Sequence, residues 1–264
     1  MAFQKSKVKN KSPIFRKPMN NPGESIQKEI ERQFSEEFAP FFMSAMFAIL
    51  FACYTWGQWY FKWSPQPFAM TLVAVLALGY TVYKFITVRK DIRNLRQGLD
   101  GEKAIGQFLE LIRDQDCRVF HDIITDKANI DHIFISSKGI FLIETKTYSK
   151  PNEGKPIVDF NGERILVNGF EPDRNPVSQT LGLTSWLHDM LLESTGRKFP
   201  IKGVIVFPGW FIENNATNKA KLWVLNPKAL PAYMENEPNL LKIEDISLIS
   251  SRIKTYMQTA TLPK

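Results

Sequence analysis

The chain has 264 residues with 34 Lys or Arg against 27 Asp or Glu, which gives a net charge of +7. This length supplies ample material for a buried core, and the 14 glycines and 16 prolines follow no repeat, which excludes a collagen-like or low-complexity protein. The two cysteines, Cys53 and Cys117, exclude a disulfide framework, and no Cys/His cluster has the spacing of a zinc site.

The basic excess lies in the first third of the chain. Residues 1–38 hold eight basic and five acidic residues, a net charge of +3. Residues 39–98 hold six basic residues and one acidic residue, a net charge of +5, whereas residues 99–264 hold twenty and twenty-one, a net charge of −1. A basic total ordinarily suggests nucleic-acid binding, but this excess flanks two apolar segments and therefore indicates membrane topology.

Two segments are apolar enough to cross a membrane. Residues 39–61 contain no charged residue, and a second run remains apolar to Val88 apart from one lysine. At about 1.5 Å per residue, each run covers a hydrocarbon core of about 30 Å. We predict a transmembrane helical hairpin with spans at about residues 40–61 and 67–88. Two buried helices of a soluble bundle are the alternative, but both runs are apolar on all sides rather than along one stripe.

The charges beside the spans predict their orientation. Basic residues precede the first span and follow the second, whereas the short link between them offers only Lys62. The positive-inside rule therefore places both termini in the cytoplasm and the link outside. We expect a multi-pass protein of the inner (cytoplasmic) membrane with the lipid bilayer as a partner. Residues 24–38 are expected to form a short amphipathic helix that leads into the first span.

Beyond the second span the pattern changes to the alternating elements of a soluble α/β domain. The helix is expected to continue to a break at Gly98, followed by a new helix over residues 100–113. Strands are predicted at residues 118–124, 130–136, 139–145, 201–207 and 221–225. Asn175-Pro176 is an N-cap and first helical residue that opens a helix to about residue 195, and two more helices open at Asn226-Pro227 and at Ile243-Glu244-Asp245.

The strands at 130–136 and 139–145 place acidic side chains opposite each other. If Ser137 and Lys138 form a two-residue turn, Asp131 lies opposite Glu144, with Cβ atoms about 5 Å apart. Lys146 points to the same face because side chains alternate along a strand. Two facing carboxylates repel, and a divalent cation such as Mg²⁺ would remove the conflict. The lysine could hold an attacking water or neutralise charge on a phosphate. The alternative is a solvated polar edge with no site.

Four further motifs, in this order along the chain, resemble the nuclease-related (NERD) domain of the PD-(D/E)xK, restriction-endonuclease-like superfamily. They are Gly101-Glu102, Ile130-Asp131-His132-Ile133, the segment from Lys138 to Lys146 and Asn175-Pro176-Val177-Ser178-Gln179. The resemblance covers roughly residues 98–210. It implies a restriction-endonuclease-like core, with a mixed central β-sheet flanked by helices, and metal-dependent hydrolysis of phosphodiester bonds.

The resemblance also implies a role for each polar residue. Asp131 and Glu144 would be ligands of Mg²⁺ or Mn²⁺, and Lys146 would be the water-positioning or charge-stabilising base. Glu102 would be an accessory acidic residue that contacts a water on the metal or a second metal. Gln179 would orient the site or the scissile phosphate. The three histidines are weaker candidates for the site. We expect a structural role for His132 and an exposed, solvated side chain for His188. A phosphate contact is considered for His121 but is not the favoured role.

The sequence therefore predicts four regions: a basic cytoplasmic segment (1–38), a transmembrane hairpin (39–88), a juxtamembrane helix (89–97) and a NERD nuclease-like domain (98–264). The leading hypothesis is a membrane-anchored, Mg²⁺-dependent nuclease. Its substrate would be nucleic acid, with DNA preferred over RNA, for example foreign DNA that enters the cell. One alternative is a catalytically silent, membrane-tethered adaptor that binds nucleic acid or protein. Another makes the hairpin a sensor or a homo-oligomerisation element, since its small residues permit close helix packing.

Overall fold

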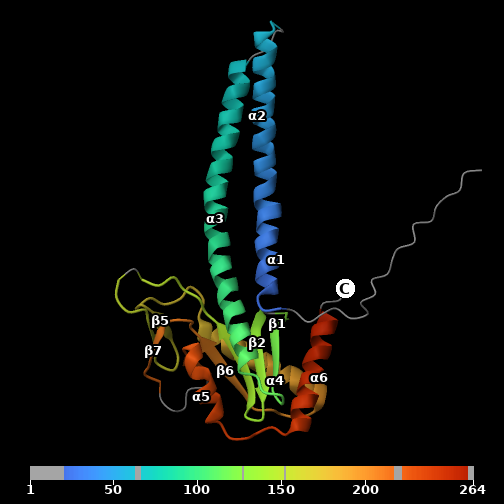
Figure 1. Cartoon of the computed structure of the whole chain (residues 1–264), viewed down its shortest axis with the longest axis vertical. Coiled ribbons are helices and arrows are strands. Elements are labelled where there is room, and N and C mark those ends of the chain that lie inside the picture. Colours follow the sequence, from blue (N-terminus) through green and yellow to red (C-terminus); the bar gives the residue numbers. More distant parts are fainter. Residues whose placement is uncertain (1–20, 63–66, 127, 152, 217–221, 261–264) are drawn as a thin grey trace, which may run out of the picture.

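Two long helices stand side by side and project from an α/β domain (Figure 1). The computed structural model describes residues 21–62, 67–126, 128–151, 153–216 and 222–260. The first twenty residues of the predicted basic segment, most of the link between the spans and the first residue of the strand predicted at 221–225 lie outside these ranges.

The first long helix changes its winding along its length. It begins as α1 (Glu24–Arg32), passes through one π-helical stretch, η1 (Gln33–Phe38), and continues as α2 (Ala39–Tyr60). The second is α3 (Pro67–Leu111), 45 residues in one piece. Both are long and apolar enough to cross a membrane, and most of their apolar side chains face outward from the protein.

The break predicted at Gly98 is wrong, because α3 runs through this residue without interruption. A glycine inside a helix costs only about 1 kcal/mol relative to alanine when good helix formers flank it. Packing offsets that cost: a Cβ at Gly98 would lie 3.7 Å from the Ile26 side chain of α1, so the two helices touch here. The helix predicted at 100–113 is therefore the last part of α3.

The hairpin is held together by small residues and two polar contacts. Ala45, Ala52 and Ala74 are buried between the helices. The Trp56 indole donates a hydrogen bond to the Thr71 hydroxyl at 2.7 Å, and the Thr81 hydroxyl donates to the carbonyl of Phe41 at 3.2 Å. The small residues thus permit close packing within the hairpin itself.

The domain is built on a five-stranded mixed sheet with the order β1-β2-β3-β6-β8. Strands β1, β2 and β3 are antiparallel, and β6 and β8 run parallel to β3. Their bounds are β1 (Arg118–Ile124), β2 (Asn129–Ser136), β3 (Gly139–Thr145), β6 (Ile201–Val206) and β8 (Leu222–Leu225). All five coincide closely with predicted strands. The mixed α/β fold class, with two long apolar helices ahead of it, is confirmed.

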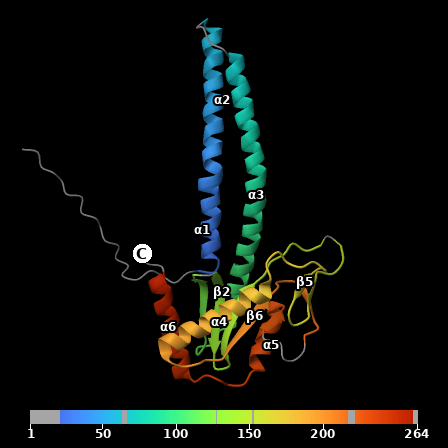
Figure 2. The same ribbon diagram turned by 180° about the vertical axis from the view of Figure 1, so that it is seen from behind.

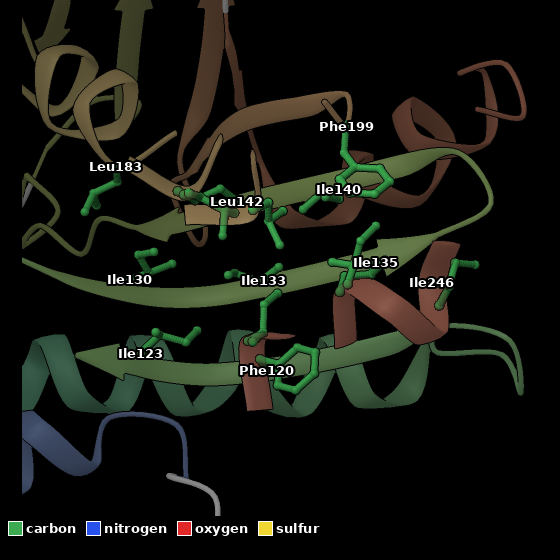
Figure 3. Close-up of a cluster of buried hydrophobic side chains, with 14 of the residues drawn as sticks. Phe120, Ile123, Ile130, Ile133, Ile135, Ile140, Leu142, Leu183, Phe199 and Ile246 are labelled. Atoms are coloured by element: carbon green, nitrogen blue, oxygen red, sulfur yellow. The ribbon is translucent and has the colours of Figure 1, made fainter. Parts of the chain in front are cut away.

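Helices cover both faces of this sheet. On one face lie α4 (Pro176–Thr195) and α6 (Ile243–Ala260), as Figure 2 shows. Their apolar side chains close the cluster drawn in Figure 3, in which Ile246 of α6 lies beside Ile135 of the sheet and Leu183 of α4 lies toward the other end. The other face packs against the end of α3 and against α5 (Leu230–Glu235). The helix predicted at Asn226-Pro227 begins as a 3₁₀ turn, η2 (Pro227–Ala229), before α5.

A second sheet of three short strands was not predicted. It has the order β5-β4-β7 and consists of β4 (Ile157–Phe160), β5 (Ile165–Val167) and β7 (Phe211–Asn214). With three or four residues each, these strands are too short for a clear period-two pattern. Their apolar residues pack on Val177 and Ile205, so this sheet extends the core beside the start of α4.

Candidate active site

The β2–β3 hairpin has the predicted register. Ser136 pairs with Gly139 across a two-residue turn, and the ladder continues to the pair His132 and Ile143. Beyond that pair, Asp131 faces the end of β3, where its Oδ2 accepts a hydrogen bond of 2.7 Å from the backbone N–H of Thr145. The turn therefore places the two predicted carboxylates at the same end of the sheet, since a slip of one residue would have moved them to opposite faces.

Three of the predicted residues form a hydrogen-bonded group. The Lys146 ammonium donates to Glu144 Oε1 at 2.8 Å and to Gln179 Oε1 at 3.0 Å. The Gln179 amide nitrogen donates to the same Glu144 oxygen at 2.7 Å. Glu144 is 2% exposed, so its charge is held away from bulk water by these two donors.

The start of α4 positions Gln179. The Asn175 side chain accepts hydrogen bonds from the backbone N–H groups of Val177 and Ser178, at 2.9 and 3.3 Å, and Pro176 occupies the first helical position. This cap is the one predicted from the sequence. It fixes the first turn of α4 against the end of β3, where Gln179 reaches Glu144.

Glu102 enters the site from α3, where the helix approaches the end of β3 very closely. A Cβ on Gly101 would lie only 2.1 Å from Cγ2 of Thr147, so any larger residue here would force the Thr147 side chain to shift. Glu102 is 9% exposed. Burial raises the pKa of Glu102 to about 8, with further contributions from the nearby charges of Asp122 and Glu144.

The other two acids share this environment. Burial raises the pKa of Asp131 well above its ordinary value, and the charges of Glu144 and Glu102 add to the effect. Burial also raises the pKa of Glu144, although the Lys146 ammonium and the Gln179 amide oppose the change. Three carboxyl groups in one buried space therefore resist simultaneous ionisation.

Lys146 is a cation at neutral pH. Its burial lowers the pKa of the ammonium, but the charge and hydrogen bond of Glu144 outweigh that effect and raise the pKa above its ordinary value. A lysine that keeps its proton donates hydrogen bonds and stabilises negative charge. Both roles predicted from the sequence, holding an attacking water and neutralising charge on a phosphate, are open to such a cation.

The donor set suits a hard divalent cation. Glu144 Oε2 is buried and has no hydrogen-bond partner within the described part of the chain, and the charges of Glu144 and Glu102 both act on Asp131. In the described ranges no group of three or more His, Cys, Asp or Glu side chains is placed to form a metal site from protein ligands alone. Mg²⁺ does not require one, since it usually takes one or two carboxylates together with waters and substrate phosphate.

The three histidines contact neighbouring side chains and none belongs to the hydrogen-bonded group of Glu144, Lys146 and Gln179. His132 is fully buried, and burial lowers its pKa to about 3, so the ring is neutral. Its Nδ1 lies 2.9 Å from Nδ1 of His121, whose other nitrogen lies 3.3 Å from the Glu110 carboxylate. His188 lies 3.3 Å from the neighbouring Asp189. The structural interpretation of His132 thus agrees with its position.

Asp122 is a residue that the sequence analysis did not identify. It is 2% exposed, has a φ of 49°, and accepts hydrogen bonds from the backbone N–H and the hydroxyl of Ser25 at 2.8 and 2.5 Å. Its charge also raises the pKa of Glu102. No local pattern indicated this role, because Ser25 is 97 residues away in the sequence.

Residues 97–208 match the family model of the nuclease-related domain (NERD). This match confirms the resemblance predicted over residues 98–210 and supports a nuclease-related function. Among solved structures, the chain matches "The structure of Pyrococcus Furiosus SfsA in complex with Ca2+" with 18% sequence identity and a TM-score of 0.25. The match covers 61% of this chain and 52% of that one, so it spans about half the length of that protein. No curated protein matches the chain.

Proposed function

We propose that the protein is a membrane-anchored, metal-dependent nuclease that hydrolyses phosphodiester bonds of DNA at the cytoplasmic face of the membrane. The observation that carries this proposal is the hydrogen-bonded group of Glu144, Lys146 and Gln179, with Asp131 and Glu102 in the same buried space, inside a nuclease-related domain. A stable fold has no need to bury three acids together, because each raises the cost of ionising the others.

Asp131 and Glu144, with Glu102 as an accessory ligand, would hold Mg²⁺ or Mn²⁺. When bound, this cation would supply Lewis-acid stabilisation of the scissile phosphate. Lys146 contributes a fixed positive charge that holds an attacking water or neutralises charge developing on the phosphate. Gln179 donates to Glu144 and accepts from Lys146, so it keeps both side chains in place.

A cavity of about 810 Å³ supports nucleic acid as the substrate. It lies at the carboxyl end of β8, where Val224 forms part of its wall. Val224 of β8 pairs with Ile205 of β6, and Ile205 pairs with Glu144 of β3. The cavity wall at Val224 therefore lies two strands, or roughly 10 Å, from Glu144. Lys155 and Lys228 supply positive charge, and the exposed rings of Phe211 and Tyr233 offer surfaces on which bases can stack.

The helical hairpin supplies the anchor. The positive-inside rule gives cytoplasmic termini, and the unbroken α3 carries the site away from the bilayer. Glu102 lies fourteen positions after Val88, which at 1.5 Å per residue corresponds to about 21 Å. This separation leaves room for a polynucleotide between the membrane and the site. A nuclease in this position would suit cleavage of foreign DNA as it enters the cell.

The test is a cleavage assay with the full chain in detergent or liposomes. Supercoiled DNA, linear duplex DNA, single-stranded DNA and RNA are incubated in parallel with Mg²⁺, with Mn²⁺ and with EDTA. We expect metal-dependent conversion of supercoiled DNA to linear product. Cleavage of RNA alone would reassign the substrate, and no cleavage of any substrate with either metal would contradict the proposed activity.

Calorimetry distinguishes the nuclease from a silent adaptor. A nuclease should bind Mn²⁺ in a manner that depends on the buried carboxylates, so that binding is lost in Glu144→Gln and kept in Glu193→Gln, which changes an exposed glutamate of α4. An adaptor that retains only the shape of the fold should show no difference between the two variants, because neither would bind the cation.

A further inference from the structure

A second cavity, which none of the candidate active-site residues lines, lies at the cytoplasmic end of the predicted second span. It has a volume of about 390 Å³ and lies between the start of the first long helix and α3. Six side chains characterise it, three aromatic and three basic: Phe34, Phe38, Phe85, Arg89, Arg93 and Arg96. We call this cavity the interfacial groove.

One wall of the interfacial groove is aromatic. The Phe38 ring lies 5.4 Å from the ring of Phe34 and 5.4 Å from that of Phe85, so the three rings join η1 to α3. Phe42 of α2 continues the row at 5.9 Å from Phe38. Phe34 and Phe85 remain 54% and 44% exposed, and this wall therefore continues the apolar surface of the span.

The other wall carries three arginines on one face of α3. Arg89, Arg93 and Arg96 have the spacing i, i+4 and i+7, which places them in line along the helix. All three are exposed, and the ion pairs and hydrogen bonds of the described residues include none that they make. Three positive charges thus line an apolar cavity.

The acidic residues opposite are engaged elsewhere. Arg32 on the facing helix lies 2.7 Å from Glu29, 3.2 Å from Glu36 and 3.7 Å from Glu37. All three carboxylates thus lie beside Arg32, and the ion pairs of the described residues join none of them to an arginine of α3. The arginines of α3 keep their charge available for an external anion.

We propose that the interfacial groove binds an anionic phospholipid of the cytoplasmic leaflet. The headgroup phosphate contacts Arg89, Arg93 and Arg96, and an acyl chain lies along the phenylalanine wall. This inference rests on the membrane placement in the proposed function. Val88 is the last apolar residue of the predicted span and Arg89 is the next residue, so the groove lies at the depth where phosphates and acyl chains meet. A nucleic-acid duplex would satisfy the arginines but leave the aromatic wall without a partner, because its bases are already stacked on one another.

The experiment measures lipid retention by the full chain. The protein is reconstituted with equal amounts of phosphatidylcholine and phosphatidylglycerol, extracted gently, and examined by native mass spectrometry for bound lipid. We expect phosphatidylglycerol to be retained in clear preference. Each change of Arg89, Arg93 or Arg96 to glutamine should weaken that preference by about fivefold, the factor for one basic residue near an anionic surface.

Lys90→Gln is the matched control. It removes the same charge one residue away but on another face of α3, about 100° around the helix from Arg89. Lys90 does not line the groove, so this variant should retain phosphatidylglycerol as the wild type does. An equal loss in Lys90→Gln would show a general surface-charge effect and would overturn the groove as a site.

Three further outcomes would contradict the proposal, each in a different way. Displacement of the lipid by inorganic phosphate would show a free-anion site. Arginine-dependent binding of a short DNA duplex that competes with phosphatidylglycerol would show a nucleic-acid surface instead. Extraction of the wild-type chain from liposomes by alkaline carbonate would refute membrane anchoring and the groove with it, whereas a retained chain without lipid preference would refute the groove alone.

Discussion

Replacing Glu102 with glutamine tests the electrostatic account of the site without relying on cleavage. The pKa of Glu102 is about 8 in the folded protein and about 4.5 when unfolded. Between these two pH values the acid holds its proton in the folded protein but has lost it in the unfolded chain. Stability is therefore greatest below about pH 4.5 and declines as the pH rises toward 8, at up to about 1.4 kcal/mol per pH unit for this group.

The expected change is large enough to measure. For a domain of this size, about 1.4 kcal/mol corresponds to roughly 3–5 °C in Tm. The wild-type domain should thus lose several degrees between pH 6 and pH 8, followed by tryptophan fluorescence, and Glu102→Gln should show a flatter profile and a higher Tm at pH 8. Asp100→Asn, at an exposed acid on the same helix, is the matched control and should follow the wild type.

Divalent cations provide the second half of this test. Mg²⁺ or Mn²⁺ at about one hundred times its dissociation constant should add about 2.7 kcal/mol of stability to the wild type at pH 8. The increase should be smaller in Glu102→Gln, which lacks one carboxylate of the site. If Glu102→Gln keeps the wild-type pH slope, or if cations stabilise neither protein, the acidic cluster is not the strained cation site described above.

Three other changes have outcomes that follow from the geometry. Gly101→Ala should lower the free energy of unfolding by about 1–3 kcal/mol, seen as a lower Tm, because its Cβ would collide with Thr147. Gly182→Ala, on the open side of α4, is the control and should raise the free energy of unfolding by about 0.5–1 kcal/mol. Ser25→Ala removes one of the two hydrogen bonds to Asp122 and should make the start of α1 more susceptible to limited proteolysis, whereas Ser251→Ala on an exposed part of α6 should not. The double variant Lys155→Gln/Lys228→Gln should weaken single-stranded DNA binding and flatten its salt dependence, measured by fluorescence anisotropy.

Each of these expectations has a contradicting result. A Gly101→Ala protein with unchanged Tm would mean that α3 and the end of β3 are not in close contact. Unchanged proteolysis of Ser25→Ala would show that α1 does not depend on Asp122 for its position. Wild-type DNA affinity in the lysine variant would exclude the cavity beside β8 as part of the substrate surface.

Local patterns predicted much of the domain core. The two-residue turn at Ser137 and Lys138 specified the register of β2 and β3, and with it the relation of Asp131 to the end of β3. The N-cap Asn175 marked the start of α4. These features depend on a few neighbouring residues, which is why the sequence alone contains them.

Features that depend on distant contacts were not predictable in this way. The contact between Gln179 and Glu144 spans 35 positions and was indicated only by the family resemblance. The crossing of α3 at Gly101 and the hydrogen bonds of Asp122 with Ser25 are likewise long-range, and the strands of the second sheet are too short for a periodic signal. Gly98 looked like a helix end because its contact with α1 could not be seen locally.

The most direct test of the account is DNA cleavage by the full chain in liposomes with Mg²⁺ or Mn²⁺, comparing Glu144→Gln and Lys146→Ala with the control Glu193→Gln. We expect the first two variants to lose at least about a hundredfold in rate, the scale of removing one charge-stabilising group from an active site, while Glu193→Gln cleaves as the wild type does. Wild-type cleavage by Glu144→Gln or Lys146→Ala would contradict the assigned site.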